Sequence, residues 1–503
     1  MAPQREPQSL RSIIPQTHDL LAGTSPPTAT PPAKNKKESR LPYLNNATLI
    51  VPLTITAHMN TTDTQSKKSR LNQEVFQVLQ EIVPEFLTEE CSPQDLIVRN
   101  LRGGLSNYLL TVSLPAIAGD NRNHDNTLLI RLHTSSAEEE TETEAEAEAS
   151  PNLLDRTLEN KISAELSQAG MAPRYHGRFV NGRIEQFYEG VRTVTCHEMA
   201  DKRYARAIAV HLARLHQMEI SCLNEKHDNG NDNDNDNGGD GIGIIGKGKG
   251  QIWERIEDWI RMAKDAWSKG EDYDKNDTKQ QKERELVEEM LVEIHSEWKW
   301  LKSELLHVDS KRSTSPHSTR TEVDRAIDFG REVVFTHMDC QSLNILTPVQ
   351  DEEVDSDYGV VIKDESMADI RLIDFEYADM NPRAADLANT FVEFCDMNNL
   401  IPDYKNQYPA ASVQDVFLLA YIREYDDALA NELEGMNKDA VDAFLSTMRD
   451  EIGKYSLLSH LCWASWALLQ SSASSIEFDY ITYATIRLEG FRFFKTRHWP
   501  ELN

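Results

Sequence analysis

The sequence predicts an α+β enzyme built from two lobes, a small lobe with an antiparallel sheet and a larger helical lobe. Three observations favour this fold class. Strand-like segments gather in the first folded part of the chain, helical spacing of apolar residues dominates after Arg203, and short strands recur where the two parts would meet. A strand-rich unit followed by a helix-rich unit suggests an enzyme with a cleft between them.

The small lobe is expected at residues 71–188. It follows a tail at 1–70 that is rich in Pro, Ser, Thr and Asn and is predicted to be disordered, with an organelle-targeting role as the weaker alternative. An acidic Glu/Ala insertion, also predicted to be disordered, interrupts the lobe at 135–150. The expected elements are a helix at Leu71–Phe86, strands at Leu96–Leu101, Tyr108–Leu114 and Leu128–Leu132, a helix over 151–169, and a hairpin of Arg174–Val180 with Arg183–Tyr188.

The large lobe is expected at residues 189–503. Low-complexity insertions at 224–250 and 309–322 are predicted to be disordered. The expected elements include helices at Trp253–Trp267 and Glu285–Leu305 and short strands at Val333–Phe335, Asn344–Leu346 and Ile370–Phe375.

Charge and composition exclude some classes of function. The 503 residues include 53 Lys and Arg against 83 Asp and Glu, a net charge of −30, which argues against binding to nucleic acid. Much of the acidic excess lies in runs at 138–148 and 228–240, which indicates solvated loops. The six cysteines are scattered, which favours reduced thiols in the cytosol. No signal peptide and no apolar run of ~18 residues is present, so we expect a cytoplasmic protein without stable membrane insertion.

The strongest chemical pattern is the run from His337 to Asn344, followed about thirty residues later by Ile373-Asp374-Phe375. Phosphoryl transfer needs a carboxylate near the attacking hydroxyl and oxygen ligands for Mg²⁺. The pattern therefore predicts Asp339 as the base, Asn344 and Asp374 as metal ligands, and ATP and Mg²⁺ as cofactors. The plain alternative is that Asp339 caps a turn and Asn344 is an ordinary loop residue.

Phosphate-binding candidates lie in the small lobe. The run Gly103-Gly104-Leu105-Ser106-Asn107 joins two expected strands, and its small residues would let backbone amides approach phosphates. A plain hairpin explains it equally well. Arg131, on the strand Leu128–Leu132, sits where kinase folds place a basic phosphate-binding residue. Glu159, in the following helix, is a natural ion-pair partner for it.

These motifs together resemble the choline/ethanolamine kinase family, over roughly Leu71 to Lys495. The matching segments, in order, are Arg102–Asn107, Leu-Ile-Arg131-Leu, Ala172–Gly177, Gly182–Phe187, His337–Asn344, Ile373–Tyr377, Asp386–Asn389, Glu393, Trp463-Ala-Ser-Trp466 and Ser475–Tyr480.

The resemblance implies a protein-kinase-like fold and transfer of the γ-phosphate of ATP to the hydroxyl of choline, ethanolamine or both, the first step of phospholipid synthesis from these amines. It implies that Gly104, Ser106, Asn107 and Arg131 bind the phosphates, that Glu159 orients Arg131, and that the adenine lies near Gln186 and Tyr188. A homodimer is an option.

The resemblance also implies a site for the substrate ammonium among aromatic and acidic side chains. Its members are Gln341, Glu393, Trp463, Trp466, Phe478 and Tyr483. A quaternary ammonium has no N–H donors and is held best by aromatic faces with a carboxylate nearby. Core packing of the aromatic residues is the alternative.

Some residues depart from the family pattern. Met338 stands where the family usually has Asn, Leu343 where it often has Gly, and Asn398 where some choline kinases have Tyr. Leu343 replaces a flexible position and is expected to alter the loop or slow turnover, although the chemical residues remain.

The sequence evidence for the preferred amine is divided. Gln341 and the segment Ile184–Phe187 favour choline, whereas Glu393-Phe394 and the segment 466–470 favour ethanolamine; we lean to choline. Rival interpretations are a protein kinase, an antibiotic-type phosphotransferase, a kinase for another small alcohol and an inactive scaffold.

Overall fold

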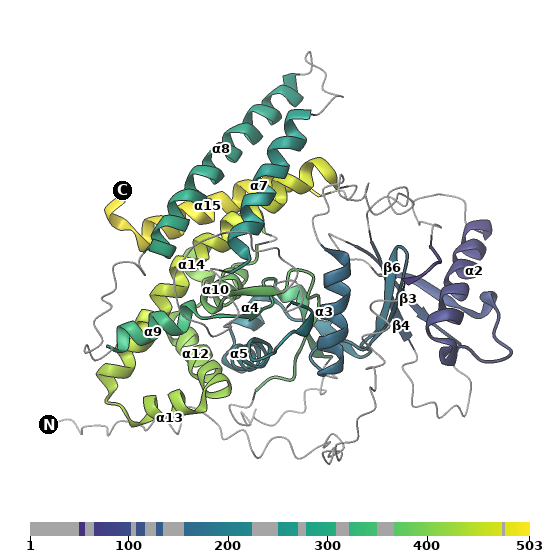
Figure 1. Ribbon diagram of the computed structural model, residues 1–503, viewed down its shortest axis with the longest axis horizontal. Helices are drawn as coiled ribbons and strands as arrows, with labels where there is room; N and C mark the ends of the chain where they lie inside the picture. The colour runs from purple at the N-terminus through teal and green to yellow at the C-terminus, as the bar shows by residue number, and fades with distance from the viewer. Residues whose placement is uncertain are drawn as a thin grey trace, which may run out of the picture.

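The structure is a computed structural model that describes residues 50–55, 65–101, 107–115, 127–133, 155–223, 250–269, 278–307, 321–349, 367–397, 399–474 and 478–502. It divides into the two expected lobes (Figure 1), which confirms the predicted fold class.

The small lobe is a six-stranded sheet with the order β1-β5-β6-β4-β3-β2. Its strands are β1 (Ile50–Val51), β2 (Ile97–Leu101), β3 (Asn107–Ser113), β4 (Thr127–His133), β5 (Tyr175–Phe179) and β6 (Gly182–Gln186). All neighbouring strands are antiparallel except β1 and β5.

Two helices flank this sheet, α2 (Gln65–Ile82) and α3 (Arg156–Gln168), and they lie on opposite sides of it (Figure 1). The apolar face of α2, including Val75, Val78 and Leu79, is buried against sheet residues such as Leu110 and Ile130. Short 3₁₀ turns at Pro84–Phe86 and Pro93–Asp95 lead from α2 into the sheet.

The predicted disordered tail at 1–70 is too long. Residues 50–55 belong to the small lobe, because Ile50 and Val51 pair with β5 and Ile55 is buried. The side chain of Asn181 accepts a hydrogen bond from the Ile55 backbone N–H (3.1 Å) and donates one to its carbonyl (3.0 Å). β-Branched residues favour this pairing at a sheet edge. Residues 1–49 and 56–64 lie outside the described part.

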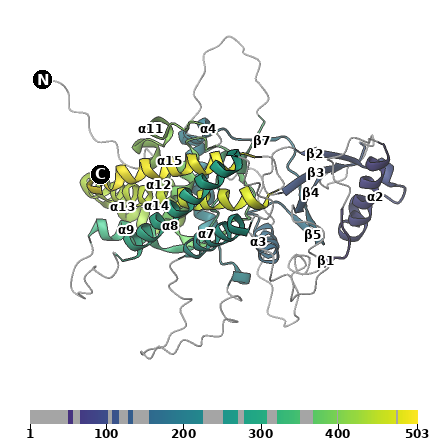
Figure 2. The same cartoon turned by 90° about the horizontal axis from the view of Figure 1, so that it is seen from above.

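The large lobe is mainly helical. Its helices are α4 (Cys196–Met199), α5 (Lys202–His216), α7 (Ile252–Lys269), α8 (Thr278–His307), α9 (Glu322–Arg331), α10 (Arg383–Glu393), α11 (Tyr404–Gln407), α12 (Ala411–Tyr425), α13 (Asp427–Gly435), α14 (Lys438–Ala473) and α15 (Tyr480–His498), with a final 3₁₀ turn at Pro500–Leu502. The central helix is α14, which packs against α15, α10, α7 and α9. Figure 2 shows α14 and α15 running alongside each other, at the far end of the molecule from α2.

Two small sheets lie in the large lobe near the junction. One has the order β10-β9-β7 and the other pairs β11 with β8. Their strands are β7 (Val191–Thr193), β8 (Val333–Thr336), β9 (Ile345–Pro348), β10 (Arg371–Leu372) and β11 (Asp379–Pro382). The expected strands at 333–335 and 344–346 match β8 and β9, whereas only the two residues of β10 form a strand within Ile370–Phe375.

Two predicted insertions end earlier than expected. Gly250 is folded and begins the approach to α7, and Thr321 and Glu322 form the start of α9, where the Thr321 side chain accepts from the Asp324 N–H. A Thr followed three residues later by Asp is a helix-start signal. The rest of these insertions, and all of 135–150, lie outside the described residues.

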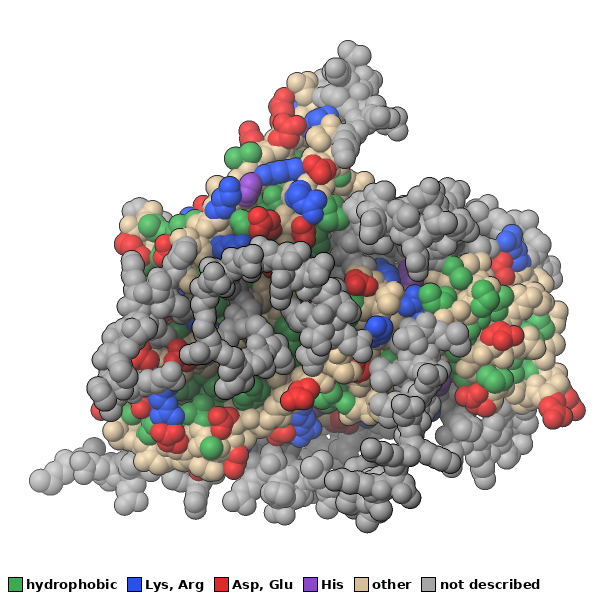
Figure 3. All heavy atoms as spheres, viewed as in Figure 1, with side chains coloured by type: hydrophobic (Ala, Val, Ile, Leu, Met, Phe, Trp, Pro, Cys, Tyr) green, Lys and Arg blue, Asp and Glu red, His purple; other side chains and the backbone are tan. Residues whose placement is uncertain are grey.

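No described helix combines the length and apolar character needed to cross a membrane. On the face shown in Figure 3, acidic and basic side chains of the described residues are interspersed rather than gathered into one acidic surface.

Candidate active site

A cavity of about 450 Å³ lies at the junction of the two lobes. It brings together, from segments far apart in the sequence, the predicted residues Arg131, Gln186, Tyr188, Asp339, Gln341, Asn344, Asp374, Glu393, Trp463, Trp466 and Tyr483. Glu159 and Phe478 are described but do not line it. Gly104 and Ser106 lie outside the described residues, as does the side chain of Asn107.

The segment that carries Asp339 is fixed by a buried carboxylate on α10. Asp386 accepts hydrogen bonds from the backbone N–H groups of His337 and Met338 (both 2.8 Å) and lies 2.9 Å from Nε2 of His216. Burial opposes ionisation of Asp386, but the bond to His216 and the nearby histidines outweigh it and lower its pKa. The carboxylate of Asp386 therefore fixes the backbone of the loop after β8 through charge-assisted hydrogen bonds.

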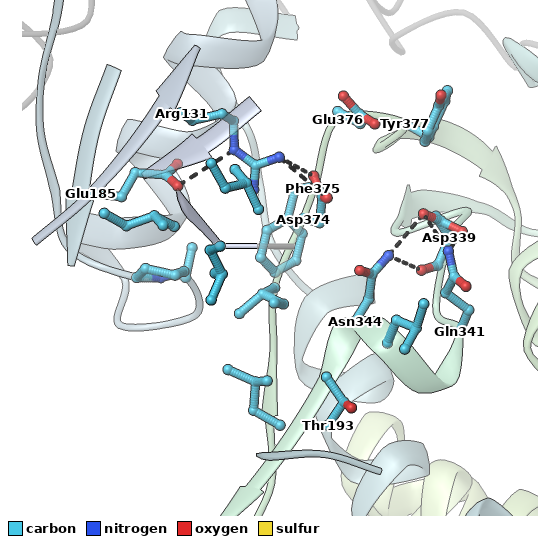
Figure 4. A pocket seen from close by; sticks show the side chains of 18 of the residues that line it. Arg131, Glu185, Thr193, Asp339, Gln341, Asn344, Asp374, Phe375, Glu376 and Tyr377 are labelled. Atoms are coloured by element: carbon cyan, nitrogen blue, oxygen red, sulfur yellow. Dashed lines mark hydrogen bonds and ion pairs between the residues drawn. The ribbon is translucent and has the colours of Figure 1, made fainter. Parts of the chain in front are cut away.

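Asp339 is buried and is held by amides (Figure 4). Asn344 Nδ2 donates to Asp339 Oδ2 at 2.8 Å, and Gln341 Nε2 lies 3.3 Å from Oδ1. Burial, and then the charges of Glu393 and Asp374, raise the pKa of Asp339 well above its usual range. A raised pKa suits a carboxylate that must accept a proton.

The other carboxylates that line the cavity each have an arginine partner. Asp374 is 3.2 Å from Arg131, Glu376 is 3.4 Å from Arg156, Glu393 is 2.6 Å from Arg487 and Glu185 is 2.6 Å from Arg183. Of the five described carboxylates that line the cavity, Asp339 alone has no cation within salt-bridge distance. Its charge is therefore the one least compensated within the cavity.

The predicted ion pair between Arg131 and Glu159 is wrong. Glu159 pairs instead with Arg183 and Arg156, while Arg131 Nε lies 3.7 Å from Glu185 and its Nη1 faces Asp374. The cause is the sheet order. Strand β6 pairs with β4 and places Arg183 opposite Arg131, so the side chains of β6 stand between α3 and Arg131.

Glu159 is thus linked to Arg131 only through Arg183 and Glu185. Burial opposes its ionisation, but Arg183 and Arg156 outweigh that cost and lower the pKa of Glu159. Glu159 therefore acts on Arg131 indirectly, through the residues between them.

Sequence reasoning missed Glu376, which lies two residues after Asp374 and also lines the cavity. Burial, and then the charge of Asp374, raise the pKa of Glu376 to about 7. The signal was present, because an Asp-x-Glu run places a second carboxylate near the first. Arg183, Glu185 and Arg487 were missed because each also pairs with a residue far away in the sequence: Glu159, Arg131 and Glu393 respectively.

One end of the cavity is apolar and draws on both lobes. Leu101, Leu109 and Leu129 approach from the sheet, with Ile373 from the large lobe, near Gln186 and Tyr188. The ring of Tyr188 lies 5.0 Å from the Arg371 guanidinium. Apolar side chains of this kind suit a purine ring.

The other end is aromatic. Trp463 and Trp466 of α14 meet edge to face at 5.6 Å, and Tyr483 of α15 lies 6.2 Å from Trp466. Trp463 Nε1 donates to Asn389 at 2.8 Å. Phe478 stands behind this group: it contacts Tyr483 at 5.7 Å and does not line the cavity, so its predicted direct contact with substrate is not supported.

A two-lobed fold with an Asp–Asn pair five residues apart, a later Asp on the same cleft and an apolar slot beside them defines a phosphotransferase of the protein-kinase-like class. The sequence profile of the choline/ethanolamine kinase family matches residues 98–492, and the chain therefore belongs to that family. Use of ATP follows from membership of this kinase family.

Individual relatives agree with this assignment. The choline/ethanolamine kinase of Rattus norvegicus is 26% identical over 402 residues, covering 79% of this chain and 80% of the relative. A choline kinase structure from Cryptosporidium parvum has a TM-score of 0.54 at 19% identity and covers 85% of this chain and 96% of its own. An ethanolamine kinase structure from Plasmodium vivax also has a TM-score of 0.54 at 19% identity, covering 88% and 94%. The two structures support the fold alone.

Proposed function

We propose that this protein transfers the γ-phosphoryl group of ATP to the hydroxyl of choline or ethanolamine. The observation that carries the proposal is the single cavity that joins Asp339, Asn344 and Asp374 to the aromatic end at Trp463 and Tyr483. The relatives are named choline/ethanolamine, choline and ethanolamine kinases, which supports the same substrate class.

We infer that Asn344 and Asp374 would hold Mg²⁺. The donor set fits: the amide nitrogen of Asn344 is engaged by Asp339, which leaves its oxygen as an acceptor, and Asp374 adds carboxylate oxygens in the same cavity. Mg²⁺ prefers hard oxygen ligands, and needs few from the protein when phosphates and water supply the rest. When bound, it would neutralise charge on the phosphates during transfer.

Asp339 would act as the general base. Its carboxylate has no cationic partner among the described residues, and the amides of Asn344 and Gln341 fix its direction. It would accept the proton of the substrate hydroxyl as the phosphorus–oxygen bond forms. Arg131 would supply positive charge to the phosphates from the small lobe.

The aromatic end would hold the ammonium of the substrate. Rings of Trp463, Trp466 and Tyr483 offer faces to a cation, and Glu393 offers a carboxylate. Because a quaternary ammonium needs no hydrogen-bond acceptor, this lining favours choline over ethanolamine. A cytoplasmic location and a homodimer remain predictions of the sequence and its family resemblance.

The test is a product assay with the full chain. Purified protein, ATP and Mg²⁺ are incubated separately with choline, with ethanolamine and with 3,3-dimethylbutan-1-ol, a neutral alcohol of the shape of choline, and phosphate esters are followed by ³¹P NMR. We expect an ester of at least one amine and little of the neutral alcohol. Protein that unfolds cooperatively on heating but phosphorylates neither amine would contradict the proposal and favour another alcohol or an inactive scaffold.

A further inference from the structure

Arg487 of α15 is a buried cation at the aromatic end of the cavity, and the sequence patterns gave it no role. Its Nη2 donates to Glu393 Oε1 at 2.6 Å, and its Nε donates to the Tyr483 hydroxyl at 2.9 Å. Its guanidinium lies 5.0 Å from the Tyr483 ring and 5.9 Å from the Trp463 ring. One side chain therefore contacts three of the residues expected to surround the substrate ammonium.

The contacts fix the carboxylate of Glu393. Glu393 ends α10, whereas Tyr483 and Arg487 belong to α15, so the arginine joins two helices at this end of the cavity. The planar guanidinium presents its donors at fixed angles, so that binding the hydroxyl of Tyr483 also sets the direction of the bond to Glu393. Because Oε1 of Glu393 takes this bond, Oε2 is the oxygen left to meet a cation in the cavity.

The pair also balances charge. A buried carboxylate without a partner would be costly, and it would favour its own protonation. With Arg487 2.6 Å away, the charge of Glu393 is compensated and its carboxylate is oriented before any substrate enters. The ammonium of the substrate then meets a carboxylate that is already in place.

We propose that Arg487 is a positioning residue for the amine: it holds Glu393 and Tyr483 in the arrangement that binds the substrate ammonium. This inference rests on the proposed function. Arg487 acts through Glu393 rather than on the reacting atoms. Its loss should therefore raise the Michaelis constant for the amine more than that for ATP.

The test is steady-state kinetics of Arg487→Lys with the amine that the wild-type protein phosphorylates. Lysine keeps a positive charge but lacks the planar fork that binds Glu393 and Tyr483 together. We expect KM for the amine to rise about tenfold, the range for losing a hydrogen bond to a charged group, with KM for ATP within about twofold.

Arg492→Lys is the matched control. Arg492 lies on the same helix and pairs with Glu293 at 2.6 Å, but it is exposed and does not line the cavity. We expect both KM values of this variant to equal those of the wild type. A rise in amine KM in the control as large as in Arg487→Lys would indicate a general effect on α15 and overturn the proposal.

A double-mutant cycle separates positioning from packing. If Arg487 acts through Glu393, then adding Arg487→Lys to Glu393→Gln should raise the amine KM little beyond Glu393→Gln alone. If the increases in amine KM caused by Arg487→Lys and Glu393→Gln multiply fully in the double mutant, Arg487 does not act through Glu393. An unchanged amine KM in folded Arg487→Lys would also refute the positioning role.

Should Arg487→Lys fail to fold, Tyr483→Phe removes only the hydroxyl that anchors the arginine. An amine KM about threefold higher, with ATP KM unchanged, would support the proposal, and an unchanged amine KM would overturn it. A wild-type protein that phosphorylates neither amine would overturn the proposed function itself, whereas active wild type with unaffected variants would overturn only this inference.

Discussion

Asp339 shares its cavity with Glu185, Asp374, Glu376 and Glu393, each of which has an arginine within 3.4 Å. An arginine partner compensates the negative charge of each of these four carboxylates. Asp339 has amide partners instead, and its pKa is raised. The difference in partners is a physical reason for this carboxylate, among five, to act as a base.

Met338 occupies a backbone conformation that few side chains adopt. Its φ is 62°, in the left-handed region where Gly and Asn are favoured. Here the Met338 side chain is buried in the core and its N–H is held by Asp386, and both contacts offset the strain.

The strained backbone at Met338 predicts which of two variants is the more stable. Both Met338→Ala and Met338→Gly lose the buried side chain, but only glycine relieves the left-handed conformation. We expect Met338→Gly to be more stable than Met338→Ala by about 1 kcal/mol, the reverse of the usual order in helices. Urea denaturation of the two variants measures the difference. An alanine variant that is the more stable of the two would show that the backbone at Met338 is not strained.

At the scale of elements, α10 connects the base to the amine end of the cavity. Asp386 holds the backbone of the loop before Asp339, and Glu393 lies about two turns further along the same face of this helix. The separation is about 10 Å along the axis. One helix thus sets the spacing between the loop that carries Asp339, the proposed base, and Glu393, the carboxylate proposed to bind the ammonium.

The end of the long insertion is fixed to the large lobe by Gly250. Its φ is 89°, and an added Cβ would lie 2.5 Å from Pro382 Cδ. The next residues bond to β11: Gln251 N–H donates to the Met380 carbonyl, and Ile252 N–H donates to Asn381 Oδ1 at 2.7 Å. The predicted insertion therefore ends in an anchored turn that starts α7.

Gly250→Ala tests this anchor. We expect it to destabilise the protein by about 2 kcal/mol or more, because it adds both a close contact with Pro382 and an unfavourable backbone conformation. Gly435→Ala is the control: no atom lies within 4 Å of its added Cβ, and we expect a change of less than about 1 kcal/mol. Thermal unfolding compares the two, and equal melting temperatures would show that Gly250 is not constrained.

Over the whole molecule, local patterns predicted much of the architecture. Strand-like apolar segments located β3 and β4, and Asn-Gly located the hairpin of β5 and β6. The residues around Asp339 are close together in the sequence, within the run from His337 to Asn344. They could therefore be identified without knowing the fold.

Contacts between distant segments could not be predicted in the same way. Arg131 meets Asp374 and Arg156 meets Glu376 across the two lobes, and both pairs depend on strand order and on how the lobes meet. The expected pair of Arg131 with Glu159 failed because β6 lies next to β4. The strand β1 was missed because two residues give no periodicity to detect.

These cross-lobe pairs belong to one chain of alternating charges. It runs from Glu159 through Arg183, Glu185 and Arg131 to Asp374 in one direction, and from Glu159 through Arg156 to Glu376 in the other. Arg131, the proposed phosphate-binding residue, and Asp374, a proposed metal ligand, thus belong to one network that spans the cleft.

The most direct test of the account is the turnover of Asp339→Asn. The isosteric amide cannot accept the hydroxyl proton, so we expect kcat for the amine to fall at least about 100-fold, while the Kd of a non-hydrolysable ATP analogue changes less than about threefold. Asp258→Asn, an exposed aspartate paired with Arg261, serves as the control and should match the wild type. If Asp339→Asn keeps most of its kcat, Asp339 is not the base and the assignment of this cavity fails.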